Sequence, residues 1–240
     1  MASTSLSSWH PTDTPDLSGK VALVTGGNAG IGREIVKELL RKNARVYLAA
    51  RSPHKARTHL YLNAGLMLPP AEDLTAQGYD LTFGTNVIGH FLFLQLIYPL
   101  LLAAPAPGPA RIVWTASFAH YQVPGDRLNY ATFTDGPERR NVSRGMFDMY
   151  AQSKLAQVAL SSYLAKHAAE VGDNVASTSL EIFRGDKPWY LLLWDRFIMY
   201  PTAYGAITPL YAGTAPEALT YHGKYLRPWA RPGDPNSAAL

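Results

Sequence analysis

Short apolar runs alternate with an amphipathic stretch at the start of the chain. Residues 20–25 (KVALVT) form a largely apolar run, which is typical of a strand buried on both faces. In residues 33–43 (REIVKELLRKN) the apolar positions recur with the period of a helix, and residues 44–50 (ARVYLAA) are apolar again. A glycine-rich loop, GGNAGIG, lies between the first run and the helix. This order predicts a βαβ unit, which is half of a nucleotide-binding fold.

Two more helices and two more strands follow. In chain order, the pattern predicts a helix over residues 80–104, a strand over 111–117 and a helix over 146–171, and a strand over 174–180 is expected from the resemblance described below. The spacer PAPGP ends the first of these helices, because proline cannot continue a helix. We expect residues 118–144 to be irregular, and the chain after Thr214 to be loop with short structured pieces.

One stretch, residues 87–104 (VIGHFLFLQLIYPLLLAA), is apolar enough to raise the question of a membrane span. His90, Gln95 and Pro99 interrupt it, and the segments on either side have the composition of a soluble protein. This context favours a buried helix.

The composition narrows the class of protein. The chain has 240 residues, of which 47% are hydrophobic and 17% charged, which predicts one folded domain over residues 18–240. Residues 1–17 are polar and rich in Ser, Thr and Pro, which predicts a disordered tail without a secretory signal, and hence a cytoplasmic protein. The lack of cysteine excludes disulfides, thiolate metal sites and thiol nucleophiles, and the histidines show no metal-binding spacing. Because the net charge of +4 is scattered, we expect no nucleic-acid partner.

The glycine loop has the pattern Thr25-Gly26-x-x-x-Gly30-x-Gly32. Glycine lets backbone N–H groups approach a pyrophosphate closely, and the helix that follows adds the positive end of its dipole. A purely structural turn is the alternative, but the strand before the loop and the helix after it favour phosphate binding. Arg51 follows the second strand, whose end faces the adenosine ribose in this fold, and an arginine there accommodates a 2′-phosphate. The sequence therefore predicts NADP over NAD, with a solvated arginine as the alternative.

A tyrosine and a lysine are placed for acid–base chemistry. Tyr150 and Lys154 lie four residues apart, so a helix puts both on one face. A nearby ammonium favours phenolate and lowers the pKa of a tyrosine, which can then exchange a proton with an alcohol or a carbonyl group. Taken alone, this pair is common by chance and is better explained as a surface contact.

Together, the glycine loop and the Tyr150–Lys154 pair resemble the short-chain dehydrogenase/reductase family. Three further motifs match in the expected order, namely Asn63-Ala64-Gly65 with Leu62 in place of the family's first asparagine, Asn86 in TNVIGHF, and Ser117 in RIVWTASFAH. The long insertion after Ser117 and the C-terminal segments YAGTAPEAL and HGKYLRPWAR resemble the retinol-dehydrogenase-like branch, and its fungal members in particular.

The resemblance implies an α/β fold, a single-domain Rossmann-like doubly wound parallel sheet, and a role for each matching residue. Tyr150 would be the acid in reduction and the base in oxidation, and Lys154 would lower its pKa and hold the nicotinamide ribose. Ser117 would hydrogen-bond the substrate carbonyl, and Asn86 would hold a water in a proton relay. The implied cofactor is NADP (NADPH), and the implied cofactor-binding residues are Gly26, Asn28, Gly30, Ile31, Gly32, Arg51, Asn63, Ala64, Gly65, Tyr150 and Lys154.

The sequence departs from the family at two places, which look like internal deletions. Only 11 residues separate Arg51 from Asn63, too few for the helix, strand and helix that the family places there. We therefore expect a sheet without the third strand and its flanking helices, and an adenine pocket without one wall. After the strand over 174–180, Glu181 and its successors stand where the family has Pro-Gly and a threonine against the nicotinamide.

The expected activity is hydride transfer between NADPH and a lipophilic alcohol, aldehyde or ketone. The apolar substrate preference rests on residues 187–200 (KPWYLLLWDRFIMY), which follow the sixth strand of the family, where its substrate cover lies. A core helix explains this segment equally well, and its two tryptophans leave contact with a membrane surface open. The apolar faces of residues 91–102 and 155–165 match the dimer helices of the family and indicate a homodimer, with packing in the core as the alternative that explains much of the same pattern. The alternative function is a non-catalytic family member with impaired cofactor binding, acting as a partner protein.

Overall fold

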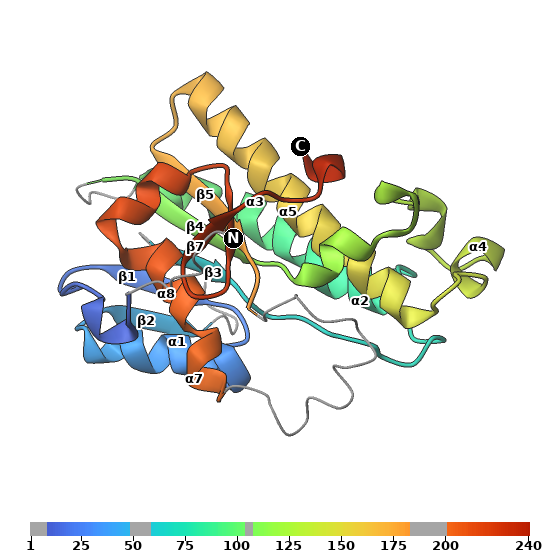
Figure 1. Ribbon diagram of the computed structural model, residues 1–240, viewed down its shortest axis with the longest axis horizontal. Helices are drawn as coiled ribbons and strands as arrows, with labels where there is room; N and C mark the ends of the chain where they lie inside the picture. The colour runs from blue at the N-terminus through green and yellow to red at the C-terminus, as the bar shows by residue number, and fades with distance from the viewer. Residues whose placement is uncertain (1–8, 49–58, 104–107, 183–200) are drawn as a thin grey trace, which may run out of the picture.

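A seven-stranded sheet runs through the computed structural model, which describes residues 9–48, 59–103, 108–182 and 201–240 (Figure 1). Its strands, in spatial order, are β2 (Arg45–Leu48), β1 (Val21–Val24), β3 (His59–Leu62), β4 (Ala110–Thr115), β5 (Val175–Leu180), β6 (Tyr225–Arg227) and β7 (Arg231–Gly233). All neighbouring strands are parallel except β6 and β7. The predicted strands are confirmed as β1, β2, β4 and β5. β3 lies within the shortened stretch before Asn63, and β6 and β7 lie within the expected loops after Thr214, where three residues are too few to show a period.

The long helices also lie where the sequence predicts them. The α-helices are α1 (Gly30–Arg41), α2 (Leu81–Phe83), α3 (Gly89–Leu102), α4 (Pro137–Arg140), α5 (Met146–Val171), α7 (Thr202–Gly205) and α8 (Ile207–Thr214). Short turns are η1 (Pro11–Asp13), η3 (Phe118–Gln122), η4 (Pro124–Asp126), η5 (Tyr130–Thr132), η7 (Pro216–Tyr221) and η8 (Ser237–Ala239). A π-helical turn, η2 (Gly84–Ile88), joins α2 to α3, so the helix predicted over 80–104 is continuous but changes its hydrogen-bond pattern in the middle.

Helices cover both faces of the sheet, because successive strand residues point to opposite sides. On β1, Ala22 and Val24 pack into a core cluster with side chains of α1 and α8. Leu23 of the same strand packs on the other face, in a cluster with side chains of α3 and α5. Figure 1 shows these two helix layers on either side of the strands. The predicted doubly wound sheet is confirmed.

The outer edge of the sheet lies at β2. Among the described strands, β2 pairs only with β1, and β1 pairs directly with β3 on its other side. Leu48 near the end of β2 is 46% exposed, although it follows an apolar pattern. Residues 49–58, which form the shortened crossover, lie outside the described residues, so the predicted loss of the family's third strand stays a prediction.

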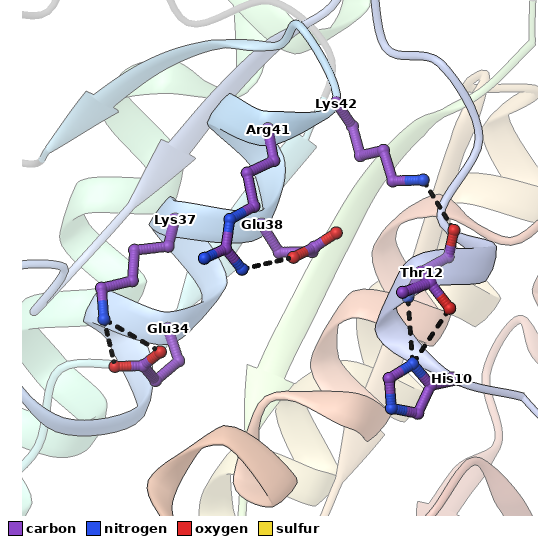
Figure 2. A network of polar contacts seen from close by, with 7 residues as sticks. All are labelled: His10, Thr12, Glu34, Lys37, Glu38, Arg41 and Lys42. Carbon is purple, nitrogen blue, oxygen red and sulfur yellow. Dashed lines mark hydrogen bonds and ion pairs between the residues drawn. The ribbon is translucent and has the colours of Figure 1, made fainter.

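The predicted disordered tail is wrong for residues 9–17, whereas residues 1–8 lie outside the described ranges. Trp9 packs edge-on against Tyr211 of α8, and Leu17 is buried in the same core cluster. Figure 2 shows how this segment is held to the end of α1, where Lys42 Nζ donates to the carbonyl of Thr12 over 2.6 Å. Two apolar side chains in an otherwise polar segment were enough to anchor it, which composition alone does not reveal.

The prediction of a buried helix over residues 87–104 holds for one side of α3 only. Leu94, Ile97 and Leu101 face the sheet and are buried. The opposite side exposes apolar side chains, with Leu92 58% and Leu96 69% exposed. By length and composition alone, the helical stretch from Leu81 to Leu102 could cross a membrane, and a third of its most apolar window is buried in the protein.

A buried ion pair fixes the start of this helical stretch. Asp80 Oδ1 accepts the backbone N–H of Phe83 over 2.8 Å and so caps α2. Its Oδ2 accepts from Arg139 of α4, with Nε at 3.1 Å and Nη2 at 3.0 Å. Arg139 also donates to the carbonyl of Asp73. Both charged side chains are almost fully buried, so each one compensates the charge of the other, which water cannot solvate.

We predict that Arg139→Met lowers the free energy of unfolding by about 3–5 kcal/mol, because it leaves the Asp80 carboxylate buried without its partner. The neighbouring Arg140 pairs with Asp135 on the surface, where the side chains are 66% and 46% exposed, so Arg140→Met should cost at most about 1 kcal/mol. Urea unfolding of both variants measures the difference. Equal losses would contradict a structural role for the buried pair.

Candidate active site

The candidate site lies at the carboxyl ends of the parallel strands, where open α/β sheets place their ligand sites. The glycine loop follows β1, the Asn63-Ala64-Gly65 motif follows β3, and Ser117 follows β4. Tyr150 and Lys154 come to this edge from α5, which packs against β4 and β5. The sheet therefore brings together motifs that are far apart in the sequence.

The glycine loop is shaped as a close backbone turn before α1. Gly26 has φ +65°, and a Cβ on it would lie 3.0 Å from the Cα of Ala64. A Cβ on Gly32 would lie 2.3 Å from the carbonyl oxygen of Gly26, so both positions need glycine. The N-cap of α1 is Ala29, whose methyl side chain cannot cap the first N–H groups of the helix. No capping side chain competes with an anion at this residue, and the glycine turn fits a pyrophosphate.

The other predicted loop residues take different positions. Asn28 is exposed at the tip of the loop. Ile31 is partly buried and packs against α7. A Cβ added to Gly205 of α7 would lie 2.7 Å from Cδ1 of Ile31. Gly65 lies next to the amide of Asn86, so that a Cβ there would lie 3.0 Å from Oδ1. Close approach of neighbouring atoms to the backbone thus explains the glycines at positions 26, 32 and 65.

Thr25 ties the glycine loop to the strand beside it. Its hydroxyl oxygen accepts the backbone N–H groups of Asn63 (2.8 Å) and Ala64 (2.9 Å). It also lies 3.0 Å from Nε2 of His90 on α3. The Asn63 side chain returns the contact by donating to the Thr25 carbonyl over 3.2 Å. These bonds hold the glycine loop and the Asn63-Ala64-Gly65 segment at a fixed distance from each other.

Asn86 lies in the π-helical turn and is fully buried. Its side-chain amide is anchored to Leu66, accepting N–H over 2.8 Å and donating to the carbonyl over 3.0 Å. Nδ2 also donates to the hydroxyl of Ser153 over 3.0 Å, and that hydroxyl donates to the carbonyl of Tyr150. The structure thus places Asn86 against α5, close to the predicted acid–base pair.

Ser117, Tyr150 and Lys154 meet at the end of β4. Ser117 lies near enough to the Tyr150 phenol to lower its pKa, and Lys154 Nζ lies 5.5 Å from the centre of the phenol ring. Lys154 donates to the carbonyl of Thr115 over 2.8 Å and to Oε1 of Gln157 over 2.9 Å. Among the described residues its third N–H has no hydrogen-bond partner, which leaves one donor for a ligand.

The pKa of Tyr150 differs from the sequence-based expectation. Burial raises this pKa above its usual value, and the side chain of Ser117 offsets part of the rise. Burial also lowers the pKa of Lys154 to about 7, so at neutral pH only part of the population carries the ammonium charge. In this structure desolvation outweighs the attraction that the i,i+4 spacing predicts.

Two predicted features lie outside the described residues, namely Arg51 and the apolar segment over residues 187–200. Glu181, which replaces the family's Pro-Gly, is described and fully buried at the end of β5. It accepts from the Tyr225 hydroxyl over 2.9 Å and lies 3.7 Å from the guanidinium of Arg227. A buried charged side chain thus stands at the place where the resemblance implies a nicotinamide contact.

The sequence analysis missed the polar residues that connect the site, His90, Ser153 and Gln157. A signal for two of them was present, because Tyr150, Ser153, Lys154 and Gln157 follow the i, i+3, i+4, i+7 spacing of one helix face. A polar stripe on a helix that is buried on most sides indicates a site rather than a solvent face.

Comparison with known proteins supports membership in the family that the sequence resembles. A family model described as short chain dehydrogenase matches residues 20–60. A short-chain dehydrogenase/reductase of Armillaria gallica is 39% identical, with 94% of this chain and 86% of that protein covered. The chain belongs to the short-chain dehydrogenase/reductase family. Its comparison with that relative extends over 274 positions, more than the 240 residues of this chain, so the relative has residues that this chain lacks.

Human retinol dehydrogenase 12 is 29% identical, with 90% of this chain and 81% of that protein covered. Among solved structures, RhlG of Pseudomonas aeruginosa, in an NADP active-site complex, superimposes with a TM-score of 0.63 at 22% identity. That match covers 96% of this chain and all of RhlG, and it shows the shared fold.

Proposed function

We propose that this protein is an NADPH-dependent oxidoreductase that interconverts a lipophilic alcohol and its ketone or aldehyde, with Tyr150 as the acid or base. The observation that carries the proposal is the meeting of Ser117, Tyr150 and Lys154 at the same edge of the sheet as the glycine loop. When bound, the nicotinamide supplies or accepts the hydride. The residues of this chain bind the cofactor and move the proton.

The glycine loop and the start of α1 would hold the pyrophosphate through backbone N–H groups. Lys154, with one N–H left over, would hold the nicotinamide ribose. Asn63 and Ala64 would hold the glycine loop in place, because their backbone N–H groups already donate to the Thr25 hydroxyl oxygen. Arg51 would contact the 2′-phosphate, a role that rests on its position in the sequence. The NADP complex of RhlG is consistent with this choice of cofactor.

Tyr150 and Ser117 would act on the substrate oxygen. In reduction, the Tyr150 phenol gives its proton to the developing alkoxide, and in oxidation the phenolate removes the alcohol proton. The Ser117 hydroxyl hydrogen-bonds the same oxygen and keeps it within reach of the phenol. Because burial raises the pKa of Tyr150, a bound cofactor and a charged Lys154 are both needed to bring that pKa toward neutral pH.

The lipophilic substrate is inferred from the apolar segment over residues 187–200 and from the likeness to retinol dehydrogenase 12, which is named for an apolar alcohol. A non-catalytic family member is the second candidate. β2 is the outermost of the described strands, and Leu48 on it is exposed. This favours the non-catalytic candidate, because an adenine would contact less protein there. A measurement of cofactor binding distinguishes the oxidoreductase from the non-catalytic family member.

We predict that the protein binds NADPH more tightly than NADH, and that Arg51→Ala removes the difference. A charge-assisted hydrogen bond to phosphate contributes about 1.5–3 kcal/mol, or roughly ten- to a hundred-fold in affinity. Energy transfer from tryptophan to nicotinamide measures both affinities without a known substrate. Equal losses for NADPH and NADH in Arg51→Ala would show that Arg51 does not contact the 2′-phosphate, and no binding of either cofactor would favour the non-catalytic candidate.

Tyr150→Phe should reduce turnover by a factor of about 10²–10⁴, because it removes the only group that exchanges the proton. The variant loses one oxygen atom, so NADPH affinity and melting temperature should change little. Steady-state assays with a panel of apolar ketones and aldehydes test this. Retained turnover in Tyr150→Phe would rule out the proposed mechanism.

We also propose that the exposed side of α3 binds a second copy of the chain. Residues 81–104 contain no Asp, Glu, Lys or Arg, so nothing on this helix opposes burial. A groove between α3 and α5 continues the apolar surface and is lined by Phe91, Leu160 and Tyr163, among others. Homodimers of the family pack through the helices at these positions, as the sequence resemblance implies.

Leu96→Glu, at the centre of this surface, should convert the dimer into monomers in sedimentation velocity experiments, because the dimer would bury an unpaired charge. Leu40→Glu is the matched control, since Leu40 is also exposed but lies on α1, across the sheet. A wild-type protein that is monomeric but floats with lipid vesicles would assign the surface to a membrane instead.

A further inference from the structure

One buried residue on the active face of α5 is left without a role in the proposed reaction. Gln157 lies one helical turn beyond Lys154 and is fully buried. A buried primary amide can make several hydrogen bonds, and leaving them unmade is costly. The partners of Gln157 therefore indicate what it does.

Gln157 bridges the lysine and the asparagine of the site. Its Oε1 accepts from Lys154 Nζ over 2.9 Å, and its Nε2 donates to the backbone carbonyl of Asn86 over 2.8 Å. The chemistry of the partners fixes the orientation of the amide. An ammonium can only donate and a carbonyl can only accept, so the amide oxygen must face Lys154 and the amide nitrogen must face Asn86.

The Asn86 carbonyl receives a second donor from α3. Nδ1 of His90 lies 3.1 Å from it, and Nε2 of the same ring lies 3.0 Å from the Thr25 hydroxyl. Burial lowers the pKa of His90 to about 4, so the ring is neutral at ordinary pH. Nδ1 therefore carries the proton and donates to Asn86, while Nε2 accepts from Thr25. A line of hydrogen bonds thus joins the glycine loop to Lys154.

We propose that Gln157 is a positioning residue, which holds the Lys154 ammonium through its amide oxygen and fastens it to the Asn86 carbonyl. The proposal rests on the proposed function, because Lys154 matters for catalysis only if it serves the cofactor and Tyr150. The Asn86 carbonyl accepts from Gln157 and from His90, so both of its neighbours in this direction are side chains of the described residues.

The amide oxygen has a measurable effect, because it favours the charged form of Lys154 against desolvation. Burial alone accounts for the lowering of the Lys154 pKa to about 7. The titratable groups that face Lys154 among the described residues are Tyr150 on α5 and His90 on α3. The carbonyl of Thr115 on β4 is the other acceptor. Removing Oε1 should therefore lower the pKa of Lys154 further.

The test is the pH dependence of folding. Above about pH 7 the folded state has lost the Lys154 proton while the unfolded chain keeps it up to about pH 10.5, so stability rises with pH. The folding constant should increase up to about tenfold per pH unit, and Lys154→Met should abolish this increase. Urea unfolding is measured from pH 5.5 to 9.5 for the wild type and for each variant described below, both with Lys154 and with Lys154→Met. The difference between the two curves of a pair is the contribution of Lys154 to the pH dependence of stability.

Gln157→Met, which keeps the volume and removes both hydrogen bonds, should move the onset of this rise about one pH unit lower. Gln157→Glu should move it higher, because a carboxylate beside the ammonium favours the charged form. The matched control is Gln152→Met. Gln152 is a buried glutamine on the same helix, which accepts from the Asn129 N–H over 2.7 Å and donates to the Thr132 hydroxyl.

Gln152→Met should lower stability and leave the onset where it is in the wild type. An unchanged onset in both Gln157 variants would overturn the proposal. So would two Gln157 variants that fail to fold while Gln152→Met folds, since the residue would then be purely structural. Because the experiment needs neither cofactor nor substrate, a protein that fails to bind NADPH contradicts the proposed function and leaves the result for Gln157 standing.

Discussion

The burial of Lys154 at the end of β4 is the constraint on which the rest of the site depends. A buried ammonium needs acceptors, and the structure supplies them from two elements, the carbonyl of Thr115 and the amide of Gln157. The amide in turn requires a partner for its N–H group and finds the carbonyl of Asn86. Satisfying one charge therefore fixes the position of α5 against the sheet and against the π-helical turn.

The same constraint links chemistry to stability. A fully exposed lysine would cost nothing to the fold, but it would be free to move and would be screened by water. Burial makes Lys154 rigid and brings its pKa to about 7, so that a small change in its surroundings changes its charge at ordinary pH. Active sites commonly accept such a loss of stability in return for tuned groups.

The shortened crossover acts on a different part of the molecule. Among the described strands β2 is the outermost and Leu48 is exposed, and the strands before Thr25, Asn63 and Ser117 keep their neighbours. The shortened crossover, which follows β2, thus lies away from the residues that meet at the end of β4. This separation explains why the two candidate functions differ in cofactor binding rather than in the geometry around Tyr150.

The sequence by itself determined the strands β1, β2, β4 and β5, the long helices, the glycine turn and the residues of the family motifs, because these depend on local periodicity and on backbone geometry. Only the tertiary structure decided what the buried polar groups contact. His90 meets Thr25 across 65 residues of sequence, and Gln157 meets Asn86 across 71. It also decided that one side of α3 stays exposed and that Trp9 and Leu17 join the core. Periodicity describes a single element, whereas burial and hydrogen bonding depend on which other elements pack against it.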